Sequence, residues 1–147
     1  MREILFRGKR VDNGEWAYGS LILEKNAFDE RLILAIISDA DENETLVNSE
    51  TVGQYTGLKD KNGTRVFEGD ILHVEQCGKT GSRITPVYFG EYIDADSVFD
   101  NYCCIGFYVK TSDGCCTIGA LLSEEFECEV IGNIHDNPEL MGGNTHG

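Results

Sequence analysis

One acidic stretch of the sequence has the spacing of a calcium-binding loop. Its oxygen-bearing side chains fall at the first, third, fifth and twelfth positions of the EF-hand scheme: Asp39, Asp41, Asn43 and Glu50. The sixth position of that scheme needs glycine for a sharp turn, and it holds Glu44 here. No convincing amphipathic helix flanks the stretch. The four residues are therefore candidates for incidental Ca²⁺ binding only, and we favour a solvated acidic loop.

Other carboxylates and histidines could take part in acid–base chemistry. The carboxylates are Asp94, Asp96 and Asp100, and the histidines are His73, His135 and His146. Two carboxylates catalyse proton transfer only when their geometry is fixed, and spacing within a loop does not fix it. Residues adjacent in sequence, such as His135 and Asp136, rarely form a base and its partner. We interpret the acidic cluster as a solvated loop and the histidines as structural.

The six cysteines include two adjacent pairs but no C-x-x-C motif. They are Cys77, Cys103, Cys104, Cys115, Cys116 and Cys128. Neighbouring residues on a strand point to opposite faces, so an adjacent pair does not readily bring both sulfurs to one zinc. Without a secretion signal we expect reduced thiols. Small buried hydrophobic residues are the favoured interpretation, and a zinc or redox role is the alternative.

Motifs of common enzyme classes are absent from the sequence. There is no G-x-S-x-G nucleophile elbow and no G-x-G-x-x-G turn after a strand. Residues 78–80 (Gly-Lys-Thr) are similar to the end of a phosphate-binding loop, but the required first glycine is replaced by His73. We predict no catalytic residue, no cofactor and no metal centre.

Composition limits the partners of the chain. It has 147 residues and a net charge of −14, which disfavours contact with phosphates of nucleic acids or with anionic lipids. Its longest purely apolar run, residues 32–37, is too short to span a bilayer. The N-terminus lacks the continuous apolar region of a signal peptide. We therefore expect a cytoplasmic protein that binds neither membranes nor nucleic acids directly.

Glycine-containing turns between short apolar runs predict a mainly β fold. Asn13-Gly14, Asn62-Gly63 and Asp113-Gly114 have the composition of tight hairpin turns. Further strands are predicted over residues 3–7, 32–37, 70–75, 87–93, 102–110 and 127–131, and short helical turns near residues 48–51, 123–126 and 137–140. This pattern indicates a small barrel or a sandwich, and an α+β fold is the alternative.

Three blocks of sequence carry a family resemblance. They are residues 1–9 (MREILFRGK), residues 50–72 (ETVGQYTGLKDKNG, then VFEGDIL) and residues 130–140 (VIGNIHDNPEL). Together, in this order, they resemble the YopX family, which is found in phages and prophages. Residues 77–129 carry no signature of the family.

The resemblance implies an SH3-type β-barrel element, self-association and no established enzymatic activity. It indicates one YopX-like domain over residues 1–147, with a smaller lobe formed by about residues 77–129. The family-motif residues, which we interpret as structural, are Gly53, Gln54, Tyr55, Thr56, Gly57, Gly63, Gly69, Asp70, Gly132, Asn133, Asp136, Asn137 and Pro138. Asp70, between a glycine and a strand, is interpreted as a turn cap.

Three classes of function remain open at this stage. The first is a noncatalytic, self-associating protein-interaction module of a phage or prophage, with an unknown host or phage protein as partner. The second is an acidic inhibitor or nucleic-acid mimic that binds a basic host protein, and salt sensitivity of binding would distinguish it. The third is a small hydrolase, which would need a deep cavity with convergent carboxylates.

Overall fold

The computed structural model describes residues 2–76, 81–95, 103–111, 114–122 and 126–143. Its contacts divide the chain into two compact units, Met1–Gly57 and Leu58–Gly147. Each unit is described by itself below. Residues 77–129, predicted as a lobe, fall entirely within the second unit.

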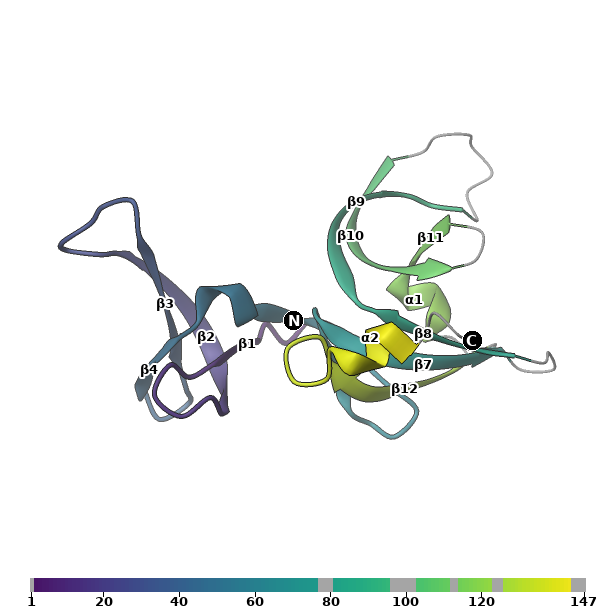
Figure 1. Cartoon of the computed structure of the whole chain (residues 1–147), viewed down its shortest axis with the longest axis horizontal. Helices are drawn as coiled ribbons and strands as arrows, with labels where there is room; N and C mark the ends of the chain where they lie inside the picture. Colours follow the sequence, from purple (N-terminus) through teal and green to yellow (C-terminus); the bar gives the residue numbers. More distant parts are fainter. Residues whose placement is uncertain (1, 77–80, 96–102, 112–113, 123–125, 144–147) are drawn as a thin grey trace. The chain divides into compact units, whose positions relative to one another are not determined.

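The first unit is an antiparallel sheet with the strand order β4-β3-β2-β1-β5 (Figure 1). Its elements are β1 (Phe6–Lys9), β2 (Trp16–Lys25), β3 (Ile33–Ser38), β4 (Glu44–Val47), η1 (Ser49–Thr51) and β5 (Gly53–Lys59). Ala35, Ile37 and Val47 form its buried core. Gly8 lies so close to this core that a Cβ there would be 2.7 Å from a methyl group of Val47. A side chain at position 8 would therefore displace β4 from β1.

The second unit contains two three-stranded antiparallel sheets, β12-β7-β8 and β11-β10-β9. Its elements are β6 (Arg65–Phe67), β7 (Asp70–Gln76), β8 (Ser82–Pro86), β9 (Tyr88–Ile93), β10 (Cys103–Thr111), β11 (Gly114–Thr117), α1 (Ile118–Leu121), β12 (Phe126–Asn133) and α2 (Glu139–Gly143). One apolar cluster joins the two sheets, with Leu72, Val87, Val109 and Cys128 among its buried members. Burial of this cluster is the main stabilising contribution that holds the unit together.

Strands β9 and β10 form a strongly bent ribbon (Figure 1). Gly90 and Gly106 lie directly opposite each other, with φ values of 152° and 158° that other residues rarely adopt. On this face, the ring of Tyr108 stacks on those of Tyr88 and Tyr92, with centroids 5.3 and 4.8 Å away. Because the glycines carry no side chains, the tyrosine rings meet above the bend.

The prediction of a mainly β fold with hairpins and short helical turns is confirmed. The described strands nevertheless form open sheets and no closed barrel. In the first unit, the edge strand β4 meets the chain beyond β1 at one bridge, Arg10 with Val47, and through the Val11 N–H bond to the Leu46 carbonyl. A closed barrel needs continuous pairing between its first and last strands, and these contacts are too few.

Individual elements differ from the sequence prediction in three places. Strand β4 forms inside the predicted acidic loop, and β8 is not among the predicted strands. Residues 118–121 form a helical turn that is not among the predicted helical turns. The predicted helical turn at residues 123–126 lies largely outside the described residues, and its last residue, Phe126, begins β12. Pro86 ends β8, at the edge of its sheet.

Candidate functional site

The central and C-terminal sequence blocks meet in the second unit around a buried carboxylate, Asp60. Its Oδ1 accepts hydrogen bonds from the backbone N–H groups of Asn62 and Thr64, both at 2.9 Å. Its Oδ2 accepts the backbone N–H of Val130 at 2.9 Å. The pairing of β12 with β7 shifts register between Val130 and Gly132, so the carboxylate binds β12 where its ladder is irregular. Asp60 thus joins the turn after β5 to the bulge of β12.

Asp70 forms a second buried turn beside this one. Gly69 has a φ of 88°, a conformation in which glycine is strongly favoured. The Oδ2 atom of Asp70 then accepts the backbone N–H of Phe67 at 2.7 Å. The backbone of Val87 bonds to both residues, accepting from the Gly69 N–H and donating to the Asp70 carbonyl. This is the geometry of a turn cap, with the carboxylate held against main-chain donors.

The C-terminal block folds back on itself through Asn133. The Oδ1 atom of Asn133 accepts the N–H groups of His135 and Asp136, at 3.0 and 2.9 Å. Its Nδ2 donates to Oδ2 of Asp136 at 3.0 Å, and its own N–H donates to Oδ1 of Asn137 at 3.3 Å. These bonds end β12 and lead the chain into α2. An asparagine side chain can bond several backbone groups in this way because it carries both donors and acceptors.

Gly132 and Gly69 each lie beside residues of the C-terminal turn. A Cβ on Gly132 would lie 2.5 Å from Oδ1 of Asn137, so the asparagine occupies the space that a side chain would need. The N–H of Ile134 donates to the carbonyl of Gly69 at 2.9 Å. The two sequence blocks therefore form one hydrogen-bonded junction between the ends of β7 and β12. We refer to Asp60, Gly69, Asp70, Gly132, Asn133, Asp136 and Asn137 as the junction.

The polar groups of the junction bond mainly to the protein's own backbone. Each carboxylate described above accepts a bond from a backbone N–H or an amide group. No group of three or more His, Cys, Asp or Glu side chains in the described part of the chain is arranged to hold a metal ion. These hydrogen bonds fix the path of the backbone, and buried polar groups paired in this way are typical of a structural element.

Sequence reasoning did not single out Asp60. Its signal is the run Asp60-Lys61-Asn62-Gly63, in which an aspartate precedes a glycine turn by three residues. Gly63 adopts the positive φ of 80° that such a turn requires. The local sequence does not predict the hydrogen bond between Asp60 and Val130, because Val130 is 70 positions away.

The N-terminal block and the start of β5 form the corresponding ladder of the first unit. Phe6 pairs with Gln54 and Arg7 pairs with Gly53, and the Tyr55 N–H donates to the carbonyl of Leu5. Thr56 lies in the same strand, and Gly57 has a φ of 86°. These family residues occupy strand positions, where their side chains pack rather than converge on a site.

Arg7 and Lys9 lie on one side of β1, beside Trp16. The guanidinium carbon of Arg7 lies 4.4 Å from the centroid of the Trp16 ring, and Nζ of Lys9 lies 5.5 Å from it. Cations at these distances are attracted to the face of an aromatic ring. This pairing of basic and aromatic side chains stabilises the β1–β2 hairpin.

The four Ca²⁺ candidates are divided between two structural elements. Asp39 caps the β3–β4 turn: its Oδ1 accepts the N–H groups of Asp41 and Asn43, and its Oδ2 accepts the side-chain amide of Asn43. These hydrogen bonds, chiefly the backbone bond from Asn43, lower the pKa of the Asp39 carboxyl. Glu50 lies beyond β4, in η1, where Asn48 caps its N–H. Asp39 therefore acts as a turn residue here.

Of the other acidic and histidine candidates, Asp94 forms a bridge with Cys115, and His73 lies 3.9 Å from a carboxylate oxygen of Glu75. His135 belongs to the C-terminal turn. Residues 96–102, which include Asp96 and Asp100, lie outside the described residues, as do His146 and the Gly-Lys-Thr run at 78–80. The described candidates thus belong to separate parts of the structure.

The described cysteines lie on strands, with the members of each adjacent pair on opposite faces. Cys103 is exposed, whereas Cys116 and Cys128 are buried. Burial raises the pKa of the Cys128 thiol to about 11, and the neighbouring Asp60 and Cys116 add to the effect. Such a thiol stays protonated and unreactive at neutral pH. Cys77 lies outside the described residues.

None of the helices in the described part of the chain is long and apolar enough to cross a membrane.

Comparison with solved structures shows the fold. The crystal structure of protein yopX from Bacillus subtilis superposes with a TM-score of 0.52 at 17% identity, covering 95% of this chain and 98% of that one. The crystal structure of protein EF1440 from Enterococcus faecalis gives a TM-score of 0.51 at 23% identity, covering 96% and 99%. No curated protein is significantly similar to the chain. The family model described as YopX protein matches residues 5–142, a span that includes the junction and the β1–β5 ladder, and the chain therefore belongs to the YopX family.

Proposed function

We propose that the protein is a noncatalytic, self-associating protein-interaction module, an accessory protein of a phage or prophage that acts in the bacterial cytoplasm. The observation that carries the proposal is the distribution of exposed apolar side chains. Phe28 is fully exposed, Ile105 is 72% exposed and Leu23 is 61% exposed. Leu23 and Phe28 belong to the first unit and Ile105 to the second, and large exposed apolar side chains on a unit's surface are typical of protein contact sites.

The chemistry of the family motifs supports the noncatalytic part of this proposal. Side-chain oxygens of Asp60, Asp70 and Asn133 accept hydrogen bonds from backbone N–H groups. A catalytic group needs a polar atom directed at a substrate, whereas these atoms hold turns. The motif residues would then be retained for the shape of the molecule, and the apolar surfaces would carry the interactions.

Sedimentation velocity over a wide concentration range tests self-association. We expect the mean sedimentation coefficient to rise with concentration. A single monomeric species at every concentration would contradict the proposal.

A second candidate is an acidic inhibitor of a basic host protein, favoured by the net charge of −14. Affinity capture from bacterial lysate at low and high salt, read by mass spectrometry, distinguishes the two. A basic partner that is lost at high salt would favour the inhibitor, because screening weakens contacts between exposed charges. A partner retained at high salt would favour the interaction module.

A further inference from the structure

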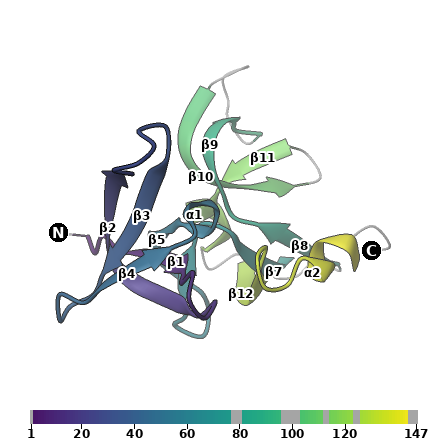
Figure 2. The same ribbon diagram turned by 60° about the vertical axis from the view of Figure 1, so that its left-hand side comes forward.

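The outer half of β2 has an edge that no described strand covers. Strand β1 pairs with β2 from Trp16 to Gly19, and from Ser20 onward β2 pairs only with β3, on its other side. Figure 2 shows β2 and β3 running side by side into the loop that joins them. The outer edge of β3 is open over a shorter length, because β4 pairs with it as far as Ala35. The longer open edge of this hairpin, which we call the arm (residues 20–38), therefore belongs to β2.

The backbone groups along this edge are arranged to bond another strand. The N–H of Asn26 donates to the carbonyl of Leu32 at 2.9 Å, which fixes the alternation of the ladder between β2 and β3. Even-numbered residues of β2 direct their N–H and C=O groups toward β3, and odd-numbered residues direct theirs away from it. The odd-numbered residues beyond the reach of β1 are Leu21, Leu23 and Lys25, which we call the open row. No other described residue bonds these backbone groups, and an exposed row of this kind can bond an added strand.

The side chains of the open row extend the core face of the sheet beyond the core itself. Leu21 packs against the buried cluster of the first unit, and Leu23, two residues along the strand, lies on the same face. Exposure rises along this face toward the loop: Ile37 is 1% exposed, whereas Ile33 is 57% and Leu23 is 61% exposed. A strand added to the open row would place further side chains beside these residues and bury them.

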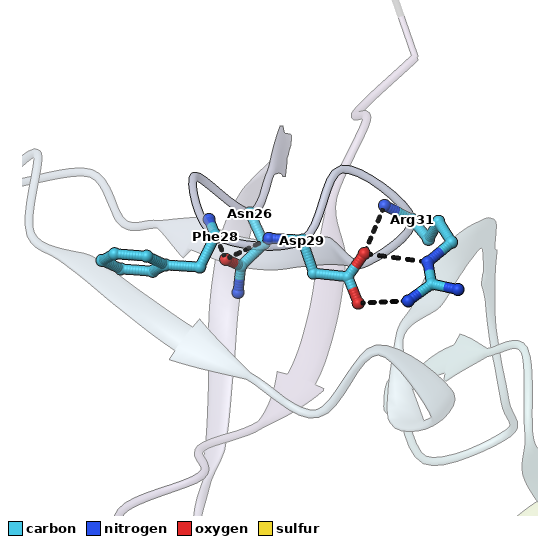
Figure 3. A network of polar contacts seen from close by, with 4 residues as sticks. All are labelled: Asn26, Phe28, Asp29 and Arg31. Atoms are coloured by element: carbon cyan, nitrogen blue, oxygen red, sulfur yellow. Dashed lines mark hydrogen bonds and ion pairs between the residues drawn. The ribbon is translucent and has the colours of Figure 1, made fainter.

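The loop at the tip of the arm is held by its own polar bonds (Figure 3). Oδ1 of Asn26 accepts the N–H groups of Phe28 and Asp29, at 2.8 and 3.3 Å. The carboxylate of Asp29 accepts the N–H of Arg31 at 3.0 Å and two guanidinium bonds at 3.1 and 3.3 Å. The charges of Asp29 and Arg31 are thus paired within the loop, and the hairpin is ordered up to its tip. A preorganised hairpin loses little conformational entropy when it binds.

We propose that the open row of one copy of this chain pairs with the open row of a second copy, antiparallel and about a two-fold axis at Leu23. In this register Leu23 lies opposite Leu23 of the second copy, and Leu21 lies opposite Lys25. The residues of each such pair direct their N–H and C=O groups at each other, so each pair exchanges two hydrogen bonds. The pairing rests on the proposed self-association and adds to it the surface, the symmetry and the register.

The limits of the open row fit a second copy of the same strand. Strand β1 already bonds this edge of β2, antiparallel, as far as Gly19, and β2 ends at Lys25. An axis at Leu23 aligns the whole row of one copy with the whole row of the other. An axis at Ile22 would instead set Lys25 opposite Gly19, whose backbone already bonds β1. The contact is isologous, so both copies use their open rows completely.

The charges of the arm favour the same register. With the axis at Leu23, Glu24 lies opposite Ile22 of the second copy, and no like charges occupy opposite positions. An axis at Glu24 would place the two Glu24 carboxylates opposite each other, which is unfavourable. The remaining charged residues of the arm, Asp29, Glu30 and Arg31, belong to the loop, beyond the paired positions.

A proline in the open row tests the pairing. Leu23→Pro removes an N–H that points away from β3, so it leaves the ladder of the arm intact. We expect it to raise the dissociation constant of the dimer roughly 10- to 100-fold, because both copies lose a hydrogen bond at the axis. Ile33→Pro is the matched control: it removes an outward N–H from the opposite edge of the same hairpin and should dimerise like the wild type. Sedimentation velocity measures both constants, and far-UV circular dichroism with thermal melting establishes that both variants are folded.

Disulfide cross-linking tests the two-fold register. The Cα atoms of directly opposite residues in a bonded pair are ~5.5 Å apart, within the range of a disulfide. In a background with Cys103→Ser, which removes the exposed cysteine of the described residues, Leu23→Cys should form a covalent dimer when oxidised in air with copper phenanthroline. Glu24→Cys is the control, because its side chain lies on the other face, opposite Ile22. Cross-linking of Glu24→Cys as fast as that of Leu23→Cys would overturn the register.

The possible results separate this inference from the proposed function. A wild type that is monomeric at every concentration overturns both. A wild type that assembles no more strongly than Leu23→Pro overturns the pairing alone. In amide exchange measured by NMR, the N–H groups of Leu23 and Lys25 should exchange rapidly in the monomer and slowly in the dimer. Slow exchange in the monomer would mean that residues 2–5, which precede β1, cover the edge within one chain, and it too would overturn the pairing.

Discussion

Asp60 is the residue on which the junction depends most directly. Its carboxylate accepts three backbone N–H bonds while it is 7% exposed. Asp60→Ala leaves those donors without their acceptor in a region that water reaches poorly, and we expect a loss of about 3 kcal/mol in the free energy of unfolding. Asp60→Asn keeps one acceptor oxygen and should cost less. Urea unfolding of the three proteins measures the difference, and equal stabilities would contradict the assigned role.

The thiol of Cys128 makes stability depend on alkaline pH. Its folded-state pKa, about 11, is above the ordinary value of 9.0. A raised pKa means that the folded protein holds the proton more tightly, so the contribution is complete below pH 9 and is lost as pH rises toward 11. Cys128→Ala removes this dependence. We expect the stability difference between wild type and variant to shrink between pH 9 and pH 11, and a constant difference would contradict the shift.

At the scale of single elements, the end of β12 leaves no room for an added side chain. Gly132→Ala would place a Cβ 2.5 Å from Oδ1 of Asn137 and force the asparagine out of its hydrogen bond to Asn133. We expect a loss of about 1–3 kcal/mol. Gly119→Ala is the matched control, because a Cβ there meets nothing within 4 Å and alanine is favoured in a helix. Thermal unfolding should therefore show a lower melting temperature for the first variant only.

Most strands could be predicted from the sequence, because their turns are local. Gly14 and Gly63 adopt the positive φ values that such turns need, and the strands beside them pair as hairpins. Strand β4 could not be predicted, because Glu44 and Thr45 are polar and gain their pairing from β3. Strand β8 was missed for the same reason: Ser82 and Arg83 gain their pairing from β7.

The junction was predictable as a set of turn residues but not as one structure. Gly69, Asp70, Gly132 and Asn133 each have the composition of a turn. The bond from Ile134 to Gly69, which brings them together, depends on the pairing of β7 with β12. Long-range pairing leaves no signal in a local pattern.

At the scale of the whole molecule, the net charge of −14 opposes compactness. Raising the salt concentration screens this self-repulsion, so we expect the melting temperature to rise with NaCl in the range where the Debye length falls from ~30 Å to ~10 Å. Choline chloride, a salt of a different cation, should act similarly if screening is the cause. A melting temperature that is unchanged or falls would show that favourable ion pairs outweigh the repulsion.

The pairing of β7 with β12 has a consequence for how the chain folds during synthesis. The strands of the first unit pair with near neighbours in sequence, except where β1 meets β5, and all of them precede residue 60. Strand β7 pairs on one edge with the nearby β8, but the partner on its other edge, β12, begins at Phe126. Contacts between residues so far apart form slowly, because the intervening loop must be closed first. The first unit can fold while the chain is still on the ribosome, whereas one edge of β7 stays unpaired until β12 emerges, and the risk of aggregation is greatest in that interval.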